Sequence, residues 1–222
     1  SEQQSIASFL DAKTKPIDAI ISKREKQIEL LEEMKSAIIS HAVTKGLNPN
    51  AKMKDSGMEW IGEVPEEWEI MPIKHVAYLQ SGDNLSSYNL IDGGDYKVYG
   101  GNGVRGYYDK FNVEGLHVLI GRQGALCGNI NYADGKFWAT EHAIVCYPLR
   151  ITATIWLGET LRSMNLNQYS ISAAQPGLAV DKIKNIKMPV PPLSEQRAIA
   201  SYLDTETSKI DARIAKRRRQ IE

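Results

Sequence analysis

Hydrophobic residues in the first fifth of the chain recur at alternating spacings of four and three. The series runs through Ile17, Ile21, Arg24, Ile28, Leu31, Lys35, Ile38 and Ala42. This spacing predicts a helix with a coiled-coil seam that two cations interrupt. We expect a short helix up to about Asp11, a break at Pro16, and a longer helix to about Thr44 that ends at Gly46.

The same seam returns at the other end of the chain, at Ile210, Ile214, Arg217 and Ile221. Residues 194–222 align with residues 1–29 without a gap, and about 18 of the 29 aligned positions are identical, which marks an internal repeat. The repeat indicates a duplicated module made of one globular domain and one helical segment. The sequence starts and stops at equivalent points of the repeat, and this favours the interpretation that it is a piece of a longer chain. Ser1 and Ser194 are the predicted N-caps, each followed by a glutamate that the helix dipole favours.

We expect the two copies to form a long antiparallel helix pair, because identical seams pack on each other with two-fold symmetry. The alternative is a solvated surface helix packed on its own domain. From Pro16 to Thr44 the helix would be about 40 Å long and could act as a ruler. The expected pairing residues are Ile17, Ile21, Ile28, Leu31, Ile38, Ile210, Ile214 and Ile221.

Between the helical segments, short apolar runs alternate with glycine-rich turns, which is typical of a strand-rich domain. A polar linker is expected over residues 47–56, followed by an apolar cluster of Trp60, Ile61, Val64 and Trp68 that ties the helix to the domain. Strands are expected over residues 68–73 and 116–120 and as a pair within 135–149, with a tight turn at 100–103 and helices over 154–166 and 180–185. The chain is therefore expected to be a mixed α+β protein, with a strand-rich globular domain flanked by long coiled-coil-like helices.

Charge and composition exclude some classes of protein. The chain has 27 basic residues (lysine and arginine) and 27 acidic residues (aspartate and glutamate), so its net charge does not indicate a nucleic-acid ligand. Any basic surface must be local or come from a partner. No run of 18 apolar residues and no signal peptide is present, so we expect a cytoplasmic protein that does not cross a membrane. Cys127 and Cys146 match no metal-binding spacing and are expected to be buried free thiols.

Three stretches carry side chains suited to nucleic-acid recognition. Arginine, asparagine and glutamine can form paired hydrogen bonds with base edges, whereas lysine and tyrosine suit phosphates. The first stretch contains Gly101, Asn102, Arg105, Tyr107, Tyr108 and Lys110; the second is Gly121-Arg122-Gln123-Gly124; the third contains Gln175, Lys182, Lys184 and Lys187. Each also has a simpler interpretation: a hairpin turn for the first, an ordinary glycine turn for the second and a solvated helix face for the lysines.

Catalytic and metal-binding residues are not expected. Glu141 and His142 form a possible acid–base pair, although a structural pair is the simpler interpretation. No histidine or cysteine spacing suits zinc.

Two motifs connect the chain to a known family. The run SGMEWIGEVPEEWE, together with LSEQRAIASYLD after a proline-rich strand end, resembles the specificity subunit of type I restriction–modification enzymes. The resemblance implies a first helical conserved region at 1–46, a target recognition domain at 47–193 and the start of a second helical conserved region at 194–222. It also supports the second candidate stretch, because an FWAT-type segment follows it here, and it adds the neighbouring Lys136 and Trp138 to the DNA-binding candidates.

The resemblance further implies a non-catalytic subunit that reads one half of a bipartite double-stranded DNA target and docks the methyltransferase subunits. The chain itself would hold no cofactor, S-adenosylmethionine would belong to the methyltransferase, and the full complex would add a restriction subunit. Self-association through the helices is expected as well. Two other functions remain open: a coiled-coil scaffold whose globular domain binds protein, and an enzyme centred on Glu141 and His142.

Overall fold

The computed structural model describes residues 2–170 and 176–221, which divide into two compact units. The chain up to Ile39 and from Tyr202 onward forms the helical unit, and Ser40–Ser201 forms the globular unit. Two long helices, α1 (Glu2–Lys45) and α4 (Leu193–Arg218), contribute residues to both. The α+β class expected from the sequence is confirmed.

Helix α1 is continuous, so the expected break at Pro16 is wrong. A proline inside a helix removes one backbone hydrogen bond, but the glutamate, lysine and leucine residues that follow favour the helix. The predicted end is confirmed: the last helical residue is Lys45, and Gly46 has a φ of 76°, the left-handed conformation common just after a helix.

Helix α4 begins two residues earlier than expected, at Leu193 instead of Glu195. The carbonyl oxygen of Pro192 accepts hydrogen bonds from the N–H groups of Glu195 and Gln196, at 2.9 and 3.0 Å. Ser194 therefore lies within the first turn, and its prediction as N-cap is wrong. The corresponding prediction for Ser1 lies outside the described residues.

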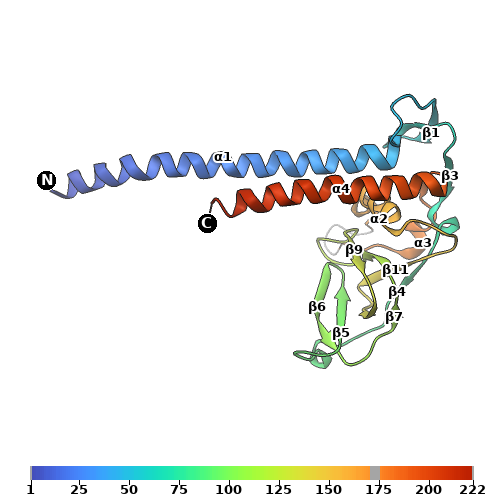
Figure 1. Cartoon of the computed structure of the whole chain (residues 1–222). Helices are drawn as coiled ribbons and strands as arrows, with labels where there is room; N and C mark the ends of the chain where they lie inside the picture. The colour runs from blue at the N-terminus through green and yellow to red at the C-terminus, as the bar shows by residue number, and fades with distance from the viewer. Residues whose placement is uncertain (1, 171–175, 222) are drawn as a thin grey trace. The chain divides into compact units, whose positions relative to one another are not determined.

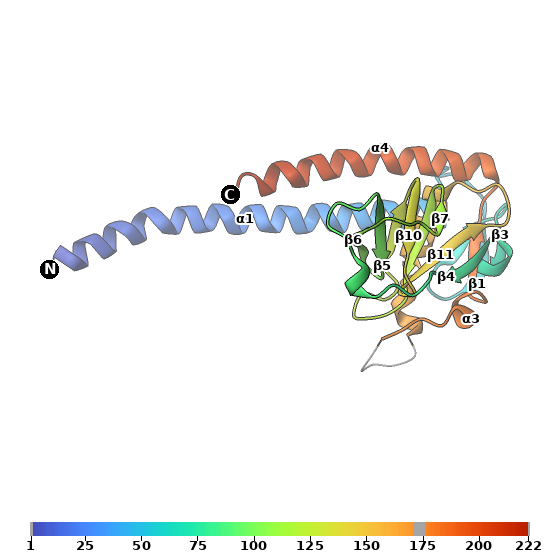
Figure 2. The same cartoon turned by 90° about the horizontal axis from the view of Figure 1, so that it is seen from below.

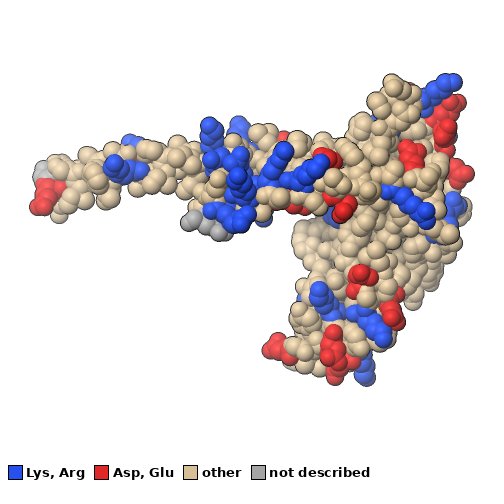
Figure 3. Space-filling view, viewed as in Figure 1, with Lys and Arg blue, Asp and Glu red and all other residues tan. Residues whose placement is uncertain are grey.

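In the helical unit, α1 and α4 run in opposite directions (Figure 1). Lys35 Nζ lies 2.7 Å from Asp211 Oδ1, and Arg218 Nη2 lies 3.1 Å from Glu32 Oε1. Lysine and arginine side chains gather where these helices lie side by side (Figure 3). The antiparallel direction agrees with the expectation, but Glu32 and Lys35 lie beyond residues 1–29. The second copy of the repeat thus forms these ion pairs with the continuation of the first helix.

The seam residues differ in burial along the helical unit. Ile210 and Ile214 of α4 are buried, and the side chain of Ile17 is 56% exposed. The remaining expected pairing residues are half-buried: Ile21, Ile28, Leu31, Ile38 and Ile221. The first half of α1 therefore presents uncovered apolar side chains.

In its described residues, the globular unit contains two four-stranded sheets and two strand pairs. One sheet has the order β6 (Gly103–Tyr108), β5 (Tyr96–Gly100), β10 (Lys136–Ala139), β7 (Val113–Glu114). The other has the order β4 (Ala77–Ser81), β11 (Ala143–Pro148), β8 (His117–Gly121), β9 (Ile130–Ala133). The pairs are β1 (Met53–Met58) with β2 (Gly62–Pro65), and β3 (Glu69–Pro72) with β12 (Lys187–Val190). The helices are α2 (Thr154–Ser163), α3 (Val180–Ile183) and 3₁₀ turns at Ile73–His75, Ser87–Asn89 and Leu166–Tyr169.

The two four-stranded sheets share one hydrophobic core. Phe137 and Tyr99 from the first sheet belong to the same buried cluster as Leu119 and Val145 from the second. The Tyr99 and Phe137 rings meet edge to face, with centroids 5.3 Å apart. Figure 2 shows the strands of both sheets within this unit. This shared core fixes the strand ends from which the candidate recognition turns leave.

Most expected elements of the globular unit are confirmed, including the turn between β5 and β6, strand β8 and helices α2 and α3. The expected strand pair within 135–149 is wrong. Both strands exist, but β10 pairs with β5 and β7, whereas β11 pairs with β4 and β8. The polar linker is also shorter than expected, because β1 already begins at Met53.

Trp68 anchors the helix ends that belong to the globular unit. Its side chain is fully buried, and its indole N–H donates to Glu195 Oε2 at 2.8 Å. A Cβ placed on Gly46 would lie 3.2 Å from the Trp68 ring and 2.7 Å from Glu195 Oε1. The end of α1 and the first turn of α4 therefore meet at one tryptophan. The sequence analysis expected the link to the first helix but not the link to α4.

The two cysteines are buried and free, as expected. Burial raises the pKa of the Cys146 thiol far above its ordinary value, so this side chain behaves as a small apolar residue. Among the described residues, no helix combines the length and the apolar character needed to cross a membrane.

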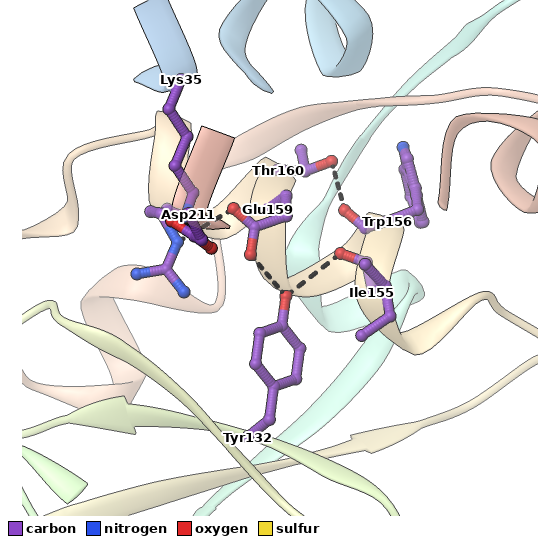
Figure 4. A network of polar contacts seen from close by, with 8 residues as sticks. Lys35, Tyr132, Ile155, Trp156, Glu159, Thr160 and Asp211 are labelled. Carbon is purple, nitrogen blue, oxygen red and sulfur yellow. Dashed lines mark hydrogen bonds and ion pairs between the residues drawn. The ribbon is translucent and has the colours of Figure 1, made fainter. Parts of the chain in front are cut away.

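A buried carboxylate joins β9 to α2. Tyr132 Oη donates to Glu159 Oε1 at 2.8 Å and lies 3.2 Å from the carbonyl oxygen of Ile155 (Figure 4). The other carboxylate oxygen accepts from Arg162 Nε at 2.9 Å. Burial and the Glu159 charge raise the pKa of the Tyr132 phenol well above its usual range, so Tyr132 remains a hydrogen-bond donor.

Gly158→Ala is expected to lower the free energy of unfolding by about 2 kcal/mol, as for other overpacked positions. The reason is that the new Cβ would lie 2.1 Å from Tyr132 Oη and must displace the ring. Urea unfolding followed by circular dichroism measures the change. In a Tyr132→Ala background the same substitution should be neutral or stabilise α2 by up to about 1 kcal/mol, because alanine favours a helix over glycine. An equal loss in both backgrounds would contradict this account.

Candidate nucleic-acid interface

Two glycine turns, which the sequence presents as separate candidates, meet backbone to backbone. The first, Gly101-Asn102, joins β5 to β6, and the second begins at Gly121, the last residue of β8. A Cβ on Gly121 would lie only 2.1 Å from the carbonyl oxygen of Gly101. A Cβ on Gly101 would lie 3.2 Å from the carbonyl oxygens of Gln123 and His142. Only glycine at position 121 permits this approach, so the contact makes the two turns one surface.

Backbone hydrogen bonds hold the second turn in place. The N–H of Arg122 donates to the carbonyl oxygen of His142 at 2.8 Å, and the Arg122 carbonyl oxygen accepts from the N–H of Leu178 at 2.8 Å. The N–H of Gly124 donates to the carbonyl oxygen of Pro176 at 3.0 Å. The turn is therefore fixed by segments on both of its sides, which keeps its exposed side chains in a defined position.

The joined turns line an open hollow of about 610 Å³. Its exposed polar side chains are Asn102, Arg105 and Gln123, the residue types that form paired contacts with base edges. The full lining is Gly100, Gly101, Asn102, Gly103, Val104, Arg105, Gln123, Gly124, Ala125, Leu126 and His142. We call this hollow the turn pocket. It gathers five residues of the first two candidate stretches: Gly101, Asn102, Arg105, Gln123 and Gly124.

Asn102 and Arg122 are more constrained than the sequence suggested. The amide oxygen of Asn102 accepts a hydrogen bond from Asn129 Nδ2 at 2.7 Å, which orients its side chain. Arg122 is half-buried, and its Nη1 lies 3.3 Å from the carbonyl oxygen of Glu141. Arg122 does not line the turn pocket, so its clearest role is to hold the second turn against the chain that follows β10.

The aromatic and basic candidates near the turns make contacts of their own. The rings of Tyr108 and Trp138 meet edge to face at 5.3 Å, and Trp138 Nε1 lies 3.4 Å from the carbonyl oxygen of Asp83. Lys136 Nζ lies 4.7 Å above the Phe111 ring. Tyr107 and Lys110 are exposed on and after β6. None of these side chains lines the turn pocket.

The lysines of the third candidate stretch are not among the residues that line the turn pocket. Lys182 is exposed on α3, and Lys184 forms an ion pair with Asp181 at the same helix. The hydrogen bond from Lys184 and the positive charge of Lys184 hold the pKa of the Asp181 carboxyl below its usual value. Lys187 is exposed at the start of β12. Gln175 lies outside the described residues.

Glu141 and His142 are in contact, with His142 Nε2 3.2 Å from Glu141 Oε1. Both side chains are about one-third exposed, yet Glu141 Oε2 and His142 Nδ1 are buried and have no hydrogen-bond partner within the described residues. Unpaired buried polar atoms are uncommon and often mark functional positions. His142 does line the turn pocket, a position that sequence reasoning missed.

Sequence reasoning also missed the apolar wall of the turn pocket. Val104 and Leu126 line it and are 48% and 49% exposed. Large apolar side chains in such a position suit contact with the methyl group of thymine or with sugar carbons. Each lies within two residues of the last glycine of its turn. In the sequence, this position was the available signal that they belong to the same surface.

Comparison with known proteins identifies the family. Residues 65–222 match the family model described as the type I restriction modification DNA specificity domain. The EcoprrI type I restriction enzyme specificity subunit from Escherichia coli is 40% identical over 151 residues, covering 62% of this chain and 38% of that protein. The MjaVIII specificity subunit from Methanocaldococcus jannaschii is 26% identical over 249 residues, covering 100% of this chain and 56% of that protein.

Solved structures share the fold. The HsdS subunit from Thermoanaerobacter tengcongensis superposes with a TM-score of 0.59 at 19% identity, covering 99% of this chain and 53% of that one. A chain from a study of complex assembly and conformational transition of the type I R-M system gives a TM-score of 0.74 at 17% identity, covering 99% and 55%. This chain thus spans less than two thirds of each of these relatives. Because the family model matches more than half of its residues, the chain belongs to the family of type I restriction modification DNA specificity domains.

Proposed function

We propose that this chain is a non-catalytic DNA-recognition component of a type I restriction–modification complex. Its globular unit reads one half of a bipartite target in double-stranded DNA. The observation that carries the proposal is the turn pocket, where base-reading side chains from two separate turns converge on one fixed surface. The family match over residues 65–222 supports the same function.

The direct readout of bases is assigned to Asn102, Arg105 and Gln123. Glutamine and asparagine suit adenine, arginine suits guanine, and the apolar wall of Val104 and Leu126 suits the thymine methyl group. The exposed cations outside the turn pocket, including Lys110 and Lys182, suit phosphate contacts, which position a protein without reading sequence. Equal numbers of acidic and basic residues in this chain fit a complex in which a partner neutralises much of the phosphate charge.

The helices are assigned to assembly. They dock methyltransferase subunits, which contribute S-adenosylmethionine and catalysis, and a restriction subunit joins the full complex. The antiparallel seam also suits pairing with a second recognition module, so that helix length sets the distance between the two halves of the DNA target. The uncovered apolar side chains on the first half of α1, such as Ile17, are consistent with such pairing.

Gln123→Ala is expected to relax recognition at one base position at a cost of about 1–3 kcal/mol, because a paired base contact is lost. Binding of the assembled complex to its target, and to single-position variants of that target, measures the effect. Lys182→Ala is the matched control, because Lys182 is exposed but lies outside the turn pocket lining. The control should weaken binding equally for all sequences. A uniform loss for Gln123→Ala as well would refute a base-reading role.

Gly121→Ala is expected to separate the two turns and abolish sequence-specific binding while lowering the free energy of unfolding by about 1–3 kcal/mol. The added Cβ would lie 2.1 Å from the backbone carbonyl oxygen of Gly101. A backbone atom cannot rotate away as the end of a side chain can. Gly158→Ala is the matched control, because its Cβ would also lie 2.1 Å from another atom, Tyr132 Oη, but outside the turn pocket lining. It should lower stability and leave sequence-specific binding intact. Urea unfolding and target binding are measured for both variants. Retained target recognition in Gly121→Ala would show that the joined turns do not form the reading surface.

A further inference from the structure

A third segment, residues 140–142, is bonded to both of the chain regions that form the turn pocket. It carries the chain from β10 to β11, and so from one sheet to the other. The N–H of Thr140 donates to the carbonyl oxygen of Tyr99, just before the first turn, at 2.9 Å. The carbonyl oxygen of His142 accepts from the N–H of Arg122, in the second turn, at 2.8 Å. These bonds fix the segment, and His142 lines the turn pocket.

The side chains of Glu141 and His142 pair with each other but leave two polar atoms without partners. His142 Nε2 lies 3.2 Å from Glu141 Oε1. Within the described residues, neither His142 Nδ1 nor Glu141 Oε2 has a hydrogen-bond partner, and both atoms are buried. Leaving a buried polar atom unpaired costs free energy, so native proteins pair nearly all of them. A ligand of the turn pocket would supply the missing hydrogen bonds.

Both unpaired atoms are hydrogen-bond acceptors. A glutamate carboxylate accepts at each of its oxygens. A neutral imidazole carries one proton, and the hydrogen bond made by one ring nitrogen decides which nitrogen holds that proton. Because the Glu141 carboxylate accepts at Nε2 of His142, it places the proton there and leaves Nδ1 as an acceptor. The pair therefore selects a ligand that donates a hydrogen bond.

The donors that base pairs present in the major groove are the exocyclic amino groups, N6 of adenine and N4 of cytosine. Guanine and thymine present acceptors there, which would face the acceptors of the pair with no hydrogen between them. We propose that His142, held by Glu141, is a further specificity-determining residue that accepts a hydrogen bond from the amino group of adenine or cytosine. The inference rests on the proposed function and adds to it a residue pair and the chemical group that this pair selects.

The two residues have different roles in this contact. His142 makes the contact with the base, and Glu141 is a positioning residue that sets the proton and the direction of the imidazole. Because Nδ1 is buried in the free chain, the two side chains have to turn toward the pocket. Their exposure of 35% and 32% permits this movement, and changes of side-chain rotamer are common when an interface forms.

Two other ligands fit the pair less well. A phosphate of the DNA backbone would meet the Glu141 carboxylate with like charge, which is repulsive. A metal ion needs more ligands than this pair offers, and no group of three histidine, cysteine, aspartate or glutamate residues in the described chain could hold one. A neutral amino group satisfies an acceptor without either difficulty.

Removal of single amino groups from the DNA tests the proposal. The assembled complex is titrated with its target duplex and with duplexes in which purine replaces one adenine or 2-pyrimidinone replaces one cytosine. Each analogue lacks the exocyclic amino group of the base that it replaces. At the position read by His142, the replacement should weaken binding by about tenfold, as for other lost base contacts. The purine and pyrimidinone series show which of the two bases is read.

Variants of the pair identify the residue that reads the amino group. His142→Phe keeps a ring but has no acceptor, so it should bind the normal and the altered duplex equally at that one position. His142→Asn retains an acceptor oxygen on a short side chain and should restore part of the discrimination. Glu141→Gln should reduce the discrimination, because the charge that holds the proton at Nε2 is lost. The matched control is His75→Phe, an exposed histidine outside the turn pocket lining, which should leave discrimination intact at every position.

Unchanged discrimination at every position in His142→Phe would overturn the proposal, and so would an equal loss of affinity for all duplexes. Lower stability in urea with no change at any base position would make Glu141 and His142 a structural pair instead. Gln123→Ala in the same assay separates this inference from the proposed function. If Gln123→Ala relaxes recognition and His142→Phe does not, the turn pocket reads DNA without this pair. If neither variant changes recognition, the proposed reading surface fails as well.

Discussion

The close approach of the Gly101 carbonyl oxygen to Gly121 is the constraint on which the candidate reading surface depends. These residues belong to different sheets, since Gly101 follows β5 and Gly121 ends β8. The hydrophobic core shared by Phe137 and Leu119 holds the two sheets together, and the missing side chain at position 121 lets their turns touch. Core packing thus positions side chains that have no other reason to be neighbours.

Trp68 fixes the ends of the two long helices that belong to the globular unit. Its indole N–H is bonded to Glu195 in the first turn of α4, and its ring lies against Gly46, just past the end of α1. Two segments separated by most of the chain are therefore fixed at one buried side chain. In the proposed function, this is where a helix of defined length would transmit spacing to the recognition module.

Local pattern predicted much of this structure. Apolar alternation located β8, the glycine and asparagine residues at 100–103 located a hairpin turn, and the seam located two long helices. These features depend on neighbouring residues, so a single sequence contains them. The break at Pro16 was wrong because proline preference is a local cost that a favourable helical sequence on both sides can outweigh.

Long-range pairing was not predictable in the same way. Strands β10 and β11 are close in sequence, yet Thr140 to His142 carry the chain from one sheet to the other. The turn pocket likewise depends on which strand ends lie side by side, so Val104, Leu126 and His142 could not be assigned to it from pattern alone. The placement of Arg122 against the Glu141 carbonyl oxygen shows that a suitable residue type in a suitable turn does not by itself define a base contact.

Hydrogen–deuterium exchange in the assembled complex, with and without its cognate duplex, tests the central claim most directly. Amide exchange follows local protection, and a bound duplex shields the segments that it contacts. The account predicts slower exchange on DNA binding over residues 100–105 and 121–126, with a smaller change over α3, where Lys182 is assigned a phosphate contact. Protection confined to α3, or an unchanged turn pocket in a complex that binds its target, would contradict it.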